Sequence, residues 1–161
     1  MGKALFFHLT HTSADEIVRA HSERALSMGW RVAIRGRDSA ALARLDEWLW
    51  AEPREGFLPH GLSGGPHDAD QPLLLTQGMD LPNRARALIA LDGAAVTADE
   101  VRDLERVWIV FDGNDADCLS IARGQWTELA QGGFELEYWG NDGSGWVRRQ
   151  ARPAAGSAAG S

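Results

Sequence analysis

The stretch that decides the fold is residues 4–35, ALFFHLTHTSADEIVRAHSERALSMGWRVAIR. It opens with a short apolar run over residues 4–9, which is typical of a buried strand. Apolar residues then recur at helical spacing over residues 14–28, and Gly29 supplies a natural helix stop. A second apolar run follows at residues 30–35. A strand, a helix and a strand joined this closely predict a βαβ unit, whose two strands lie parallel in one sheet.

The residues downstream continue this alternation of strands and helices. A helix capped by Asp38 or Ser39 is predicted to run to Trp50, and a connection rich in Gly, Pro and His follows over residues 52–72. The remaining predicted elements are strands over residues 71–77, 85–91, 106–111 and 134–139 and helices over residues 98–104 and 115–130. The alternating strand 134–139 is predicted to lie at an edge. The pattern predicts a three-layer α/β fold, a mostly parallel sheet flanked by helices in a nucleotide-binding-like topology.

With 161 residues the chain is long enough for one domain with a real core and too short to favour two. We expect residues 1–150 to form a single α/β domain and the Ala-, Gly- and Ser-rich residues 151–161 to form a flexible tail. No apolar run approaches the roughly 20 residues needed to span a bilayer. The single cysteine, Cys118, cannot form an internal disulfide. These features predict a cytoplasmic protein without membrane contact.

The formal net charge of −7 argues against a protein that coats nucleic acid, because such binding depends on neutralising phosphates. The seven tryptophans still leave direct binding of single-stranded DNA open as an alternative, since bases stack on aromatic rings. A small nucleotide-dependent enzyme is the other alternative, because βαβ folds often hold phosphates.

Motifs for nucleotide binding are weak in this sequence. The cluster Gly61, Gly64 and Gly65 is followed by Pro66 and by no Lys-Ser or Lys-Thr pair, so we predict no phosphate loop. The turn at residues 112–115 follows a predicted strand and precedes a predicted helix, where a carboxylate could hold magnesium. A strand end followed by a helix N-cap explains the same residues without any ligand, and we favour that interpretation.

Metal binding and nucleophilic catalysis are no better supported. His8 and His11 lie three residues apart on or near a strand, where such residues point to opposite faces, and neither His60 nor His67 has a ligand at metal-binding spacing. Cys118 falls within a predicted helix beside apolar residues, which indicates packing rather than reactivity. We therefore predict no catalytic residues, no metal site and no cofactor.

Aromatic residues gather near the end of the second predicted helix. Trp48 and Trp50 end that helix, and Phe57, Leu58 and Pro59 follow in the connection after it. Burying all of these side chains at once is difficult, and partly exposed aromatic residues are typical of protein-binding sites. Either tryptophan could also simply complete the core.

A second group lies on the last long predicted helix, where Arg123, Trp126 and Thr127 stand at i, i+3 and i+4 and share one face. An arginine beside an indole can hold the terminal carboxylate and the apolar side chain of a peptide together. The alternative is a solvated arginine next to a half-buried tryptophan.

Together these residues resemble the chi subunit of bacterial DNA polymerase III, an accessory protein of the clamp-loader complex. The similarity rests on Leu5-Phe6-Phe7, Arg44-Leu45-Asp46-Glu47 with Leu49-Trp50, Phe57-Leu58-Pro59-His60, Ala122-Arg123, Trp126 and Gly133-Phe134. The resemblance implies a noncatalytic, replisome-associated protein with a nucleotide-binding-like fold that lacks the phosphate-binding machinery. It also implies that the protein links the clamp loader to single-stranded DNA-binding protein by holding the acidic C-terminal tail of that partner.

Carried over residue by residue, the resemblance implies that Arg123 pairs with the tail carboxylate, that Trp126 stands at an aromatic position and that Phe57 lines the apolar side. Thr127 departs from the pattern, because a basic residue is expected there, so another arginine would have to supply that charge. Members of the family can also bind the psi subunit. We expect the surface that binds psi or the clamp loader to include Trp50, Leu58 and Pro59.

Overall fold

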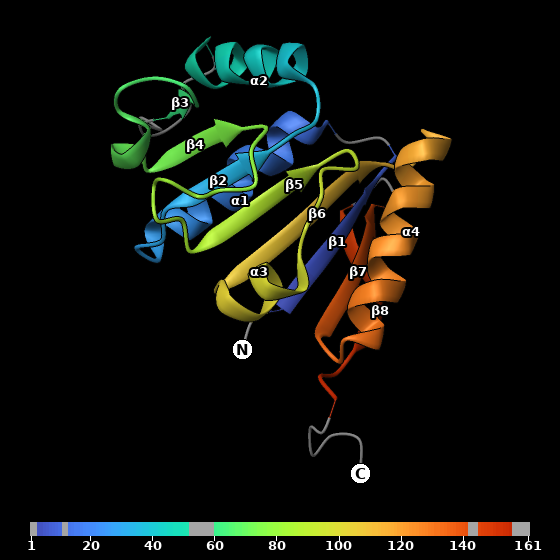
Figure 1. Ribbon diagram of the computed structural model, residues 1–161. Coiled ribbons are helices and arrows are strands. Elements are labelled where there is room, and N and C mark those ends of the chain that lie inside the picture. Colours follow the sequence, from blue (N-terminus) through green and yellow to red (C-terminus); the bar gives the residue numbers. More distant parts are fainter. Residues whose placement is uncertain (1–2, 11–12, 52–59, 142–144, 156–161) are drawn as a thin grey trace.

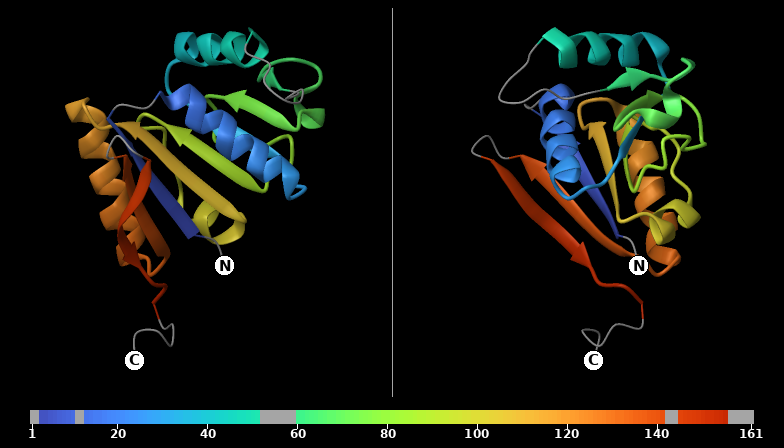
Figure 2. Two further views of the ribbon diagram at one scale, coloured as in Figure 1. Left: turned by 180° about the vertical axis from the view of Figure 1, so that it is seen from behind. Right: turned by 90° about the vertical axis from the view of Figure 1, so that its left-hand side faces the viewer.

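The computed structural model describes residues 3–10, 13–51, 60–141 and 145–155. Figure 1 shows a twisted sheet with helices on both of its faces, and the two views of Figure 2 agree with this layering. The sheet has eight strands in the order β3-β4-β2-β5-β6-β1-β7-β8, and each neighbouring pair is parallel except β7 with β8. The predicted three-layer, mostly parallel α/β fold is therefore confirmed.

The elements largely follow the predicted order. The strands are β1 (Lys3–Leu9), β2 (Val32–Arg35), β3 (Gly61–Leu62), β4 (Leu73–Thr76), β5 (Ala87–Leu91), β6 (Arg106–Asp112), β7 (Glu135–Asn141) and β8 (Trp146–Arg152). The helices are α1 (Ala14–Ser27), α2 (Ser39–Ala51), α3 (Ala98–Asp103) and α4 (Ala116–Gln131), with a 3-10 turn at Asp68–Asp70. Within the described ranges, none of these helices is both long enough and apolar enough to cross a membrane.

The first three elements form the predicted βαβ unit. The Ser13 side chain caps α1 by accepting a hydrogen bond from the backbone N–H of Asp15. Gly29 adopts a φ of 82° where the chain leaves the helix, a conformation that favours glycine. β1 and β2 are parallel members of one sheet but not neighbours, because β5 and β6 lie between them. β1 thus occupies an interior position between β6 and β7.

The helices divide between the two faces of the sheet. α1 and α2 pack against one face through a core that includes Ile17, Val18 and Leu45. α3 and α4 pack against the other face through a core that includes Val101 and Ala122. Figure 1 shows α4 running beside β7, near the side of the sheet that ends in β8. The helix that carries the predicted tail-binding residues therefore lies over β6, β1 and β7.

The last strand of the sheet is a correction to the sequence analysis. Residues 134–139 were expected at an edge, but β7 lies between β1 and β8, and β8 forms the edge. β8 is exposed along nearly its whole length, so it lacks the apolar periodicity that identifies a strand. Pairing with β7, rather than burial, fixes its conformation. The expected domain boundary at residue 150 falls inside this strand, and residues 156–161 lie outside the described part.

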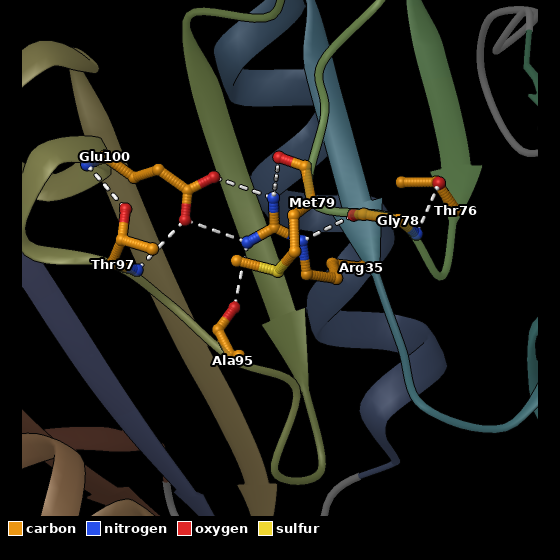
Figure 3. A network of polar contacts seen from close by, with 7 residues as sticks. All are labelled: Arg35, Thr76, Gly78, Met79, Ala95, Thr97 and Glu100. Atoms are coloured by element: carbon orange, nitrogen blue, oxygen red, sulfur yellow. Dashed lines mark hydrogen bonds and ion pairs between the residues drawn. The ribbon is translucent and has the colours of Figure 1, made fainter.

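A buried ion pair connects the end of β2 to α3. The Arg35 side chain is 1% exposed, and its guanidinium donates two hydrogen bonds to the Glu100 carboxylate at 2.7 and 2.9 Å. Figure 3 shows that the remaining donors reach backbone carbonyl groups of Gly78, Met79 and Ala95. Glu100 also closes a capping box with Thr97 at the start of α3. The Arg35 side chain thus connects β2 to the loop at Gly78, to the loop at Ala95 and to α3.

Candidate functional site

α4 presents the predicted site residues on its outer side. The helix begins at an N-cap, where the Asp115 side chain accepts hydrogen bonds from the backbone N–H groups of Asp117 and Cys118. Its inner side is buried in the core and includes Cys118, Ala122 and Leu129. Arg123 and Thr127 are exposed as a result, and Trp126 is half-buried.

Trp126 bridges α4 and the sheet. Its ring packs edge-on against Phe6 of β1, with centroids 5.3 Å apart, and against Tyr138 of β7, with centroids 5.9 Å apart. Thr127 is turned back to its own helix, because its hydroxyl donates a hydrogen bond to the Arg123 carbonyl at 3.0 Å. The indole is therefore held in place by aromatic neighbours and still partly reaches the surface beside Arg123.

His8 and Tyr138 form a polar pair beneath this part of α4. The Nδ1 atom of His8 and the Tyr138 hydroxyl lie 2.7 Å apart. Burial lowers the pKa of His8 below its ordinary value of 6.5, the charges of Arg149 and Arg123 lower it further, and Asp112 opposes them. Burial raises the pKa of Tyr138, while the same two arginines act in the opposite direction. At neutral pH the imidazole is thus uncharged and the phenol is protonated.

A surface pocket of about 350 Å³ opens next to this pair. Its lining residues are His8, Thr10, Tyr138, Gly140, Asn141 and Arg149. The walls combine an aromatic ring, polar atoms and one guanidinium, which suits an anionic ligand with a small apolar part. The candidate site can therefore extend from the outer side of α4 to this neighbouring pocket, whose walls come mainly from β1, β7 and β8.

The second predicted surface is described only in part. Trp50, in the last turn of α2, is 46% exposed, and its ring packs on that of His60 with centroids 4.1 Å apart. His60 is buried, and its Nε2 atom lies 3.2 Å from the backbone carbonyl oxygen of Asp46. Trp48 instead packs against the core, and Arg19 lies over its ring at 5.5 Å. Three predicted site residues, Phe57, Leu58 and Pro59, lie outside the described residues.

The rival nucleotide motifs have local structural roles. The backbone N–H groups of Gly64 and Gly65 donate hydrogen bonds to the Asp68 carboxylate, at 2.8 and 3.1 Å. Asp112 accepts from the Asn114 N–H in the turn before α4. The turn at residues 112–115 is thus a strand end followed by a helix cap, as predicted. Among the described residues, no group of three or more His, Cys, Asp or Glu side chains is arranged to hold a metal ion.

Cys118 lies on the buried side of α4. Burial, followed by the negative charge of Asp92, raises the pKa of its thiol to about 11. A protonated, buried thiol agrees with the predicted packing role.

His8, Tyr138 and Arg149 were not among the residues that the sequence placed in the candidate site. Both His8 and Tyr138 lie in predicted strands, but a strand pattern does not tell which strands are neighbours. The register places Phe6 opposite Tyr138 and His8 opposite Gly140, which brings the two rings together. Arg149 lies in the strand that has no apolar period, so no sequence signal pointed to it.

Comparisons with known proteins agree with one another. The family described as "DNA polymerase III chi subunit, HolC" matches residues 1–137. The "Probable DNA polymerase III subunit chi" of Rickettsia prowazekii (strain Madrid E) is 25% identical over 114 residues, which cover 66% of this chain and 69% of that protein. The "DNA polymerase III subunit chi" of Escherichia coli (strain K12) is 38% identical over 53 residues, which cover 33% of this chain and 36% of that protein. α4 lies within the residues that the family matches, and β8 lies beyond them.

Proposed function

The chain belongs to the DNA polymerase III chi subunit family, and from this premise we propose that it links the clamp loader to single-stranded DNA-binding protein. The link is the acidic C-terminal tail of that partner, which ends in an apolar residue and a free carboxylate. The protein acts as a noncatalytic accessory subunit in DNA replication. The observation that carries the proposal is an exposed Arg123 beside a half-buried Trp126 on one face of α4.

Arg123 is available to a ligand. Its guanidinium has no hydrogen bond or ion pair to any residue in the described part of the chain, and it lies near enough to His8 and Tyr138 to act on the pKa of both. A charge-assisted hydrogen bond from this group would hold the tail carboxylate. The exposed edge of Trp126, fixed by Phe6 and Tyr138, would pack against the apolar side chain at the tail end.

The proposal requires a local positive surface on an acidic protein. The net charge of −7 repels an acidic tail at long range, whereas Arg123 attracts it at short range. Salt screens both effects, so binding at moderate ionic strength depends on the contacts at the site. We expect a dissociation constant in the micromolar range, equivalent to about −8 kcal/mol.

The psi subunit, or the clamp loader itself, is proposed to bind near the end of α2. The support is the exposed Trp50 ring, which packs on the ring of the buried His60. Leu58 and Pro59 belong to the same proposed surface, while Phe57 is proposed to line the apolar side of the tail site.

Isothermal titration with a synthetic tail peptide tests the proposal. Arg123→Ala should weaken binding by about 1.5–3 kcal/mol, or about 10- to 150-fold, because a charge-assisted bond is lost. Arg102→Ala is the matched control, since Arg102 is an exposed arginine on α3 that pairs with its neighbours Asp99 and Asp103. A peptide that lacks its last residue should bind weakly to every variant.

Two results would count against this function. An affinity that is the same for wild type and Arg123→Ala would remove Arg123 from the site. Tight binding of a single-stranded oligonucleotide in the absence of its binding protein, with a steep dependence on salt, would favour a direct DNA binder instead.

A further inference from the structure

An irregularity in the edge strand determines where Arg149 points. Tyr138 pairs with Gln150 and Trp139 pairs with Arg148, so Arg149 is the extra residue of a β-bulge. Bulges redirect a side chain out of the normal alternation of a strand. The neighbouring Arg148 lies on the other face, where its guanidinium is 3.8 Å from the Glu137 carboxylate. The side chains of these two adjacent arginines of β8 therefore lie on opposite faces of the sheet.

Gly140 gives the Arg149 side chain room to lie across β7. A Cβ atom at position 140 would overlap the Nε atom of Arg149 and would approach its Cδ atom to 3.0 Å. Position 140 is on the same face as Tyr138, because side chains two residues apart along a strand share a face. The Arg149 side chain thus lies over the strand beside Tyr138 and forms one wall of the pocket at His8.

The guanidinium groups of Arg149 and Arg123 approach the His8–Tyr138 pair from two different elements, β8 and α4. Both charges act on the pKa of His8 and on that of Tyr138, after the larger effect of burial. Within the described residues, neither guanidinium forms an ion pair or a hydrogen bond, and Asp112 is the one acidic group that acts on His8. Arg149 in the pocket wall and Arg123 near the pocket therefore carry two positive charges that the described part of the chain leaves unpaired.

We propose that Arg149 is the second cation of the tail-binding site and binds an acidic side chain of the tail, while Arg123 binds the terminal carboxylate. This inference rests on the proposed function. It also explains how the site can work with Thr127, which has no charge and whose hydroxyl is hydrogen-bonded within α4. The second charge comes instead from β8, which lies beyond the residues that the family matches.

Titration of the tail peptide against Arg149→Gln and Arg148→Gln tests this role. The two variants remove the same charge from adjacent positions on opposite faces of one strand. Arg149→Gln should weaken binding about fivefold or more, and Arg148→Gln less than about twofold. Arg149→Lys should retain most of the affinity, because it restores the charge. A thermal melt of each variant checks that β8 still pairs.

A second peptide, with its acidic side chains replaced by amides and its terminal carboxylate kept, shows whether the contact is direct. It should bind wild type and Arg149→Gln equally, whereas Arg123→Ala should still weaken its binding. Equal binding of the acidic peptide by wild type and Arg149→Gln would overturn the inference and leave the proposed function intact. A wild-type protein that binds neither peptide would overturn the proposed function itself.

Discussion

Replacing Glu100 with Gln tests how strongly the buried ion pair supports the fold around the end of β2. The Glu100 carboxylate accepts two hydrogen bonds from Arg35 and one, at 3.0 Å, from the backbone N–H of Thr97. Gln has nearly the same size, but it removes the negative charge and turns an N–H donor toward the guanidinium. Arg35 would keep its backbone carbonyl acceptors and lose its counter-charge.

The size of the effect follows from these contacts. Removing one partner of a buried ion pair costs about 3–5 kcal/mol, and losing a hydrogen bond to a charged group costs about 1.5–3 kcal/mol. Since the Glu100 side chain is 13% exposed and other acceptors remain, we expect Glu100→Gln to lower the free energy of unfolding by about 2–4 kcal/mol. For a domain of this size the melting temperature should fall by roughly 5–15 °C.

Thermal unfolding followed by circular dichroism measures this shift. Glu105→Gln is the matched control, because Glu105 pairs with Arg86 at the surface, where the two side chains are 45% and 58% exposed. Such exposed pairs contribute less than about 1 kcal/mol. A Glu100→Gln protein that melts at the same temperature as Glu105→Gln would show that the network in Figure 3 contributes little to stability.

The same pair predicts a pH dependence. Burial alone raises the pKa of Glu100, but the hydrogen bonds from Arg35 and Thr97 and the charge of Arg35 outweigh it and leave the pKa below 4.5. The stability that this carboxylate contributes is therefore fully present above pH 4.5 and is lost as the pH falls through the folded-state pKa. The stability difference between wild type and Glu100→Gln should shrink over that range, and a constant difference would refute the reasoning.

Further predictions concern the tail site, and each is measured by titration of the tail peptide. Thr127→Lys should tighten binding severalfold, because it adds a charge beside the site and sacrifices only a local hydrogen bond. A bound anion should raise the lowered pKa of His8, so affinity should increase as the pH falls into the range where His8 becomes protonated, and His8→Gln should abolish that increase. The charged and titratable groups that act on or contact His8 are Arg123, Arg149, Asp112 and Tyr138. Gly140→Ala should displace the Arg149 side chain and weaken binding as Arg149→Gln does, whereas Gly124→Ala, which meets no atom within 4 Å, should not.

The sequence predicted the central sheet because buried parallel strands are continuous apolar runs. β1, β2, β5 and β6 are all of this kind, and the helices between them carry caps and apolar faces. β8 was missed because its side chains are exposed and a partner strand holds its backbone. β3 was missed because two residues are too short for any period. Periodicity reports burial, so an element that is not buried leaves no such signal.

The candidate site was predictable to the extent that it lies on one element. Helical spacing alone places Arg123 and Trp126 on a shared face, and the structure agrees that both reach the surface of α4. Strand order, register and a β-bulge decide where the side chains of His8, Tyr138 and Arg149 lie. These features arise from contacts between distant parts of the chain, so the sequence did not predict them. The Arg35–Glu100 pair, separated by 65 residues, was invisible for the same reason.

The protonated thiol of Cys118 offers a chemical reporter for the helix that carries the proposed tail site. With a pKa of about 11, only about one thiol in a thousand is ionised at pH 8, and the residue is only 6% exposed. An alkylating reagent should therefore modify this single cysteine slowly in the folded protein and faster whenever α4 lifts from the core. Mass spectrometry measures how fast Cys118 is labelled in each variant. A variant that has only lost a contact with the tail should be labelled at the wild-type rate, whereas a variant whose helix opens more often should be labelled faster.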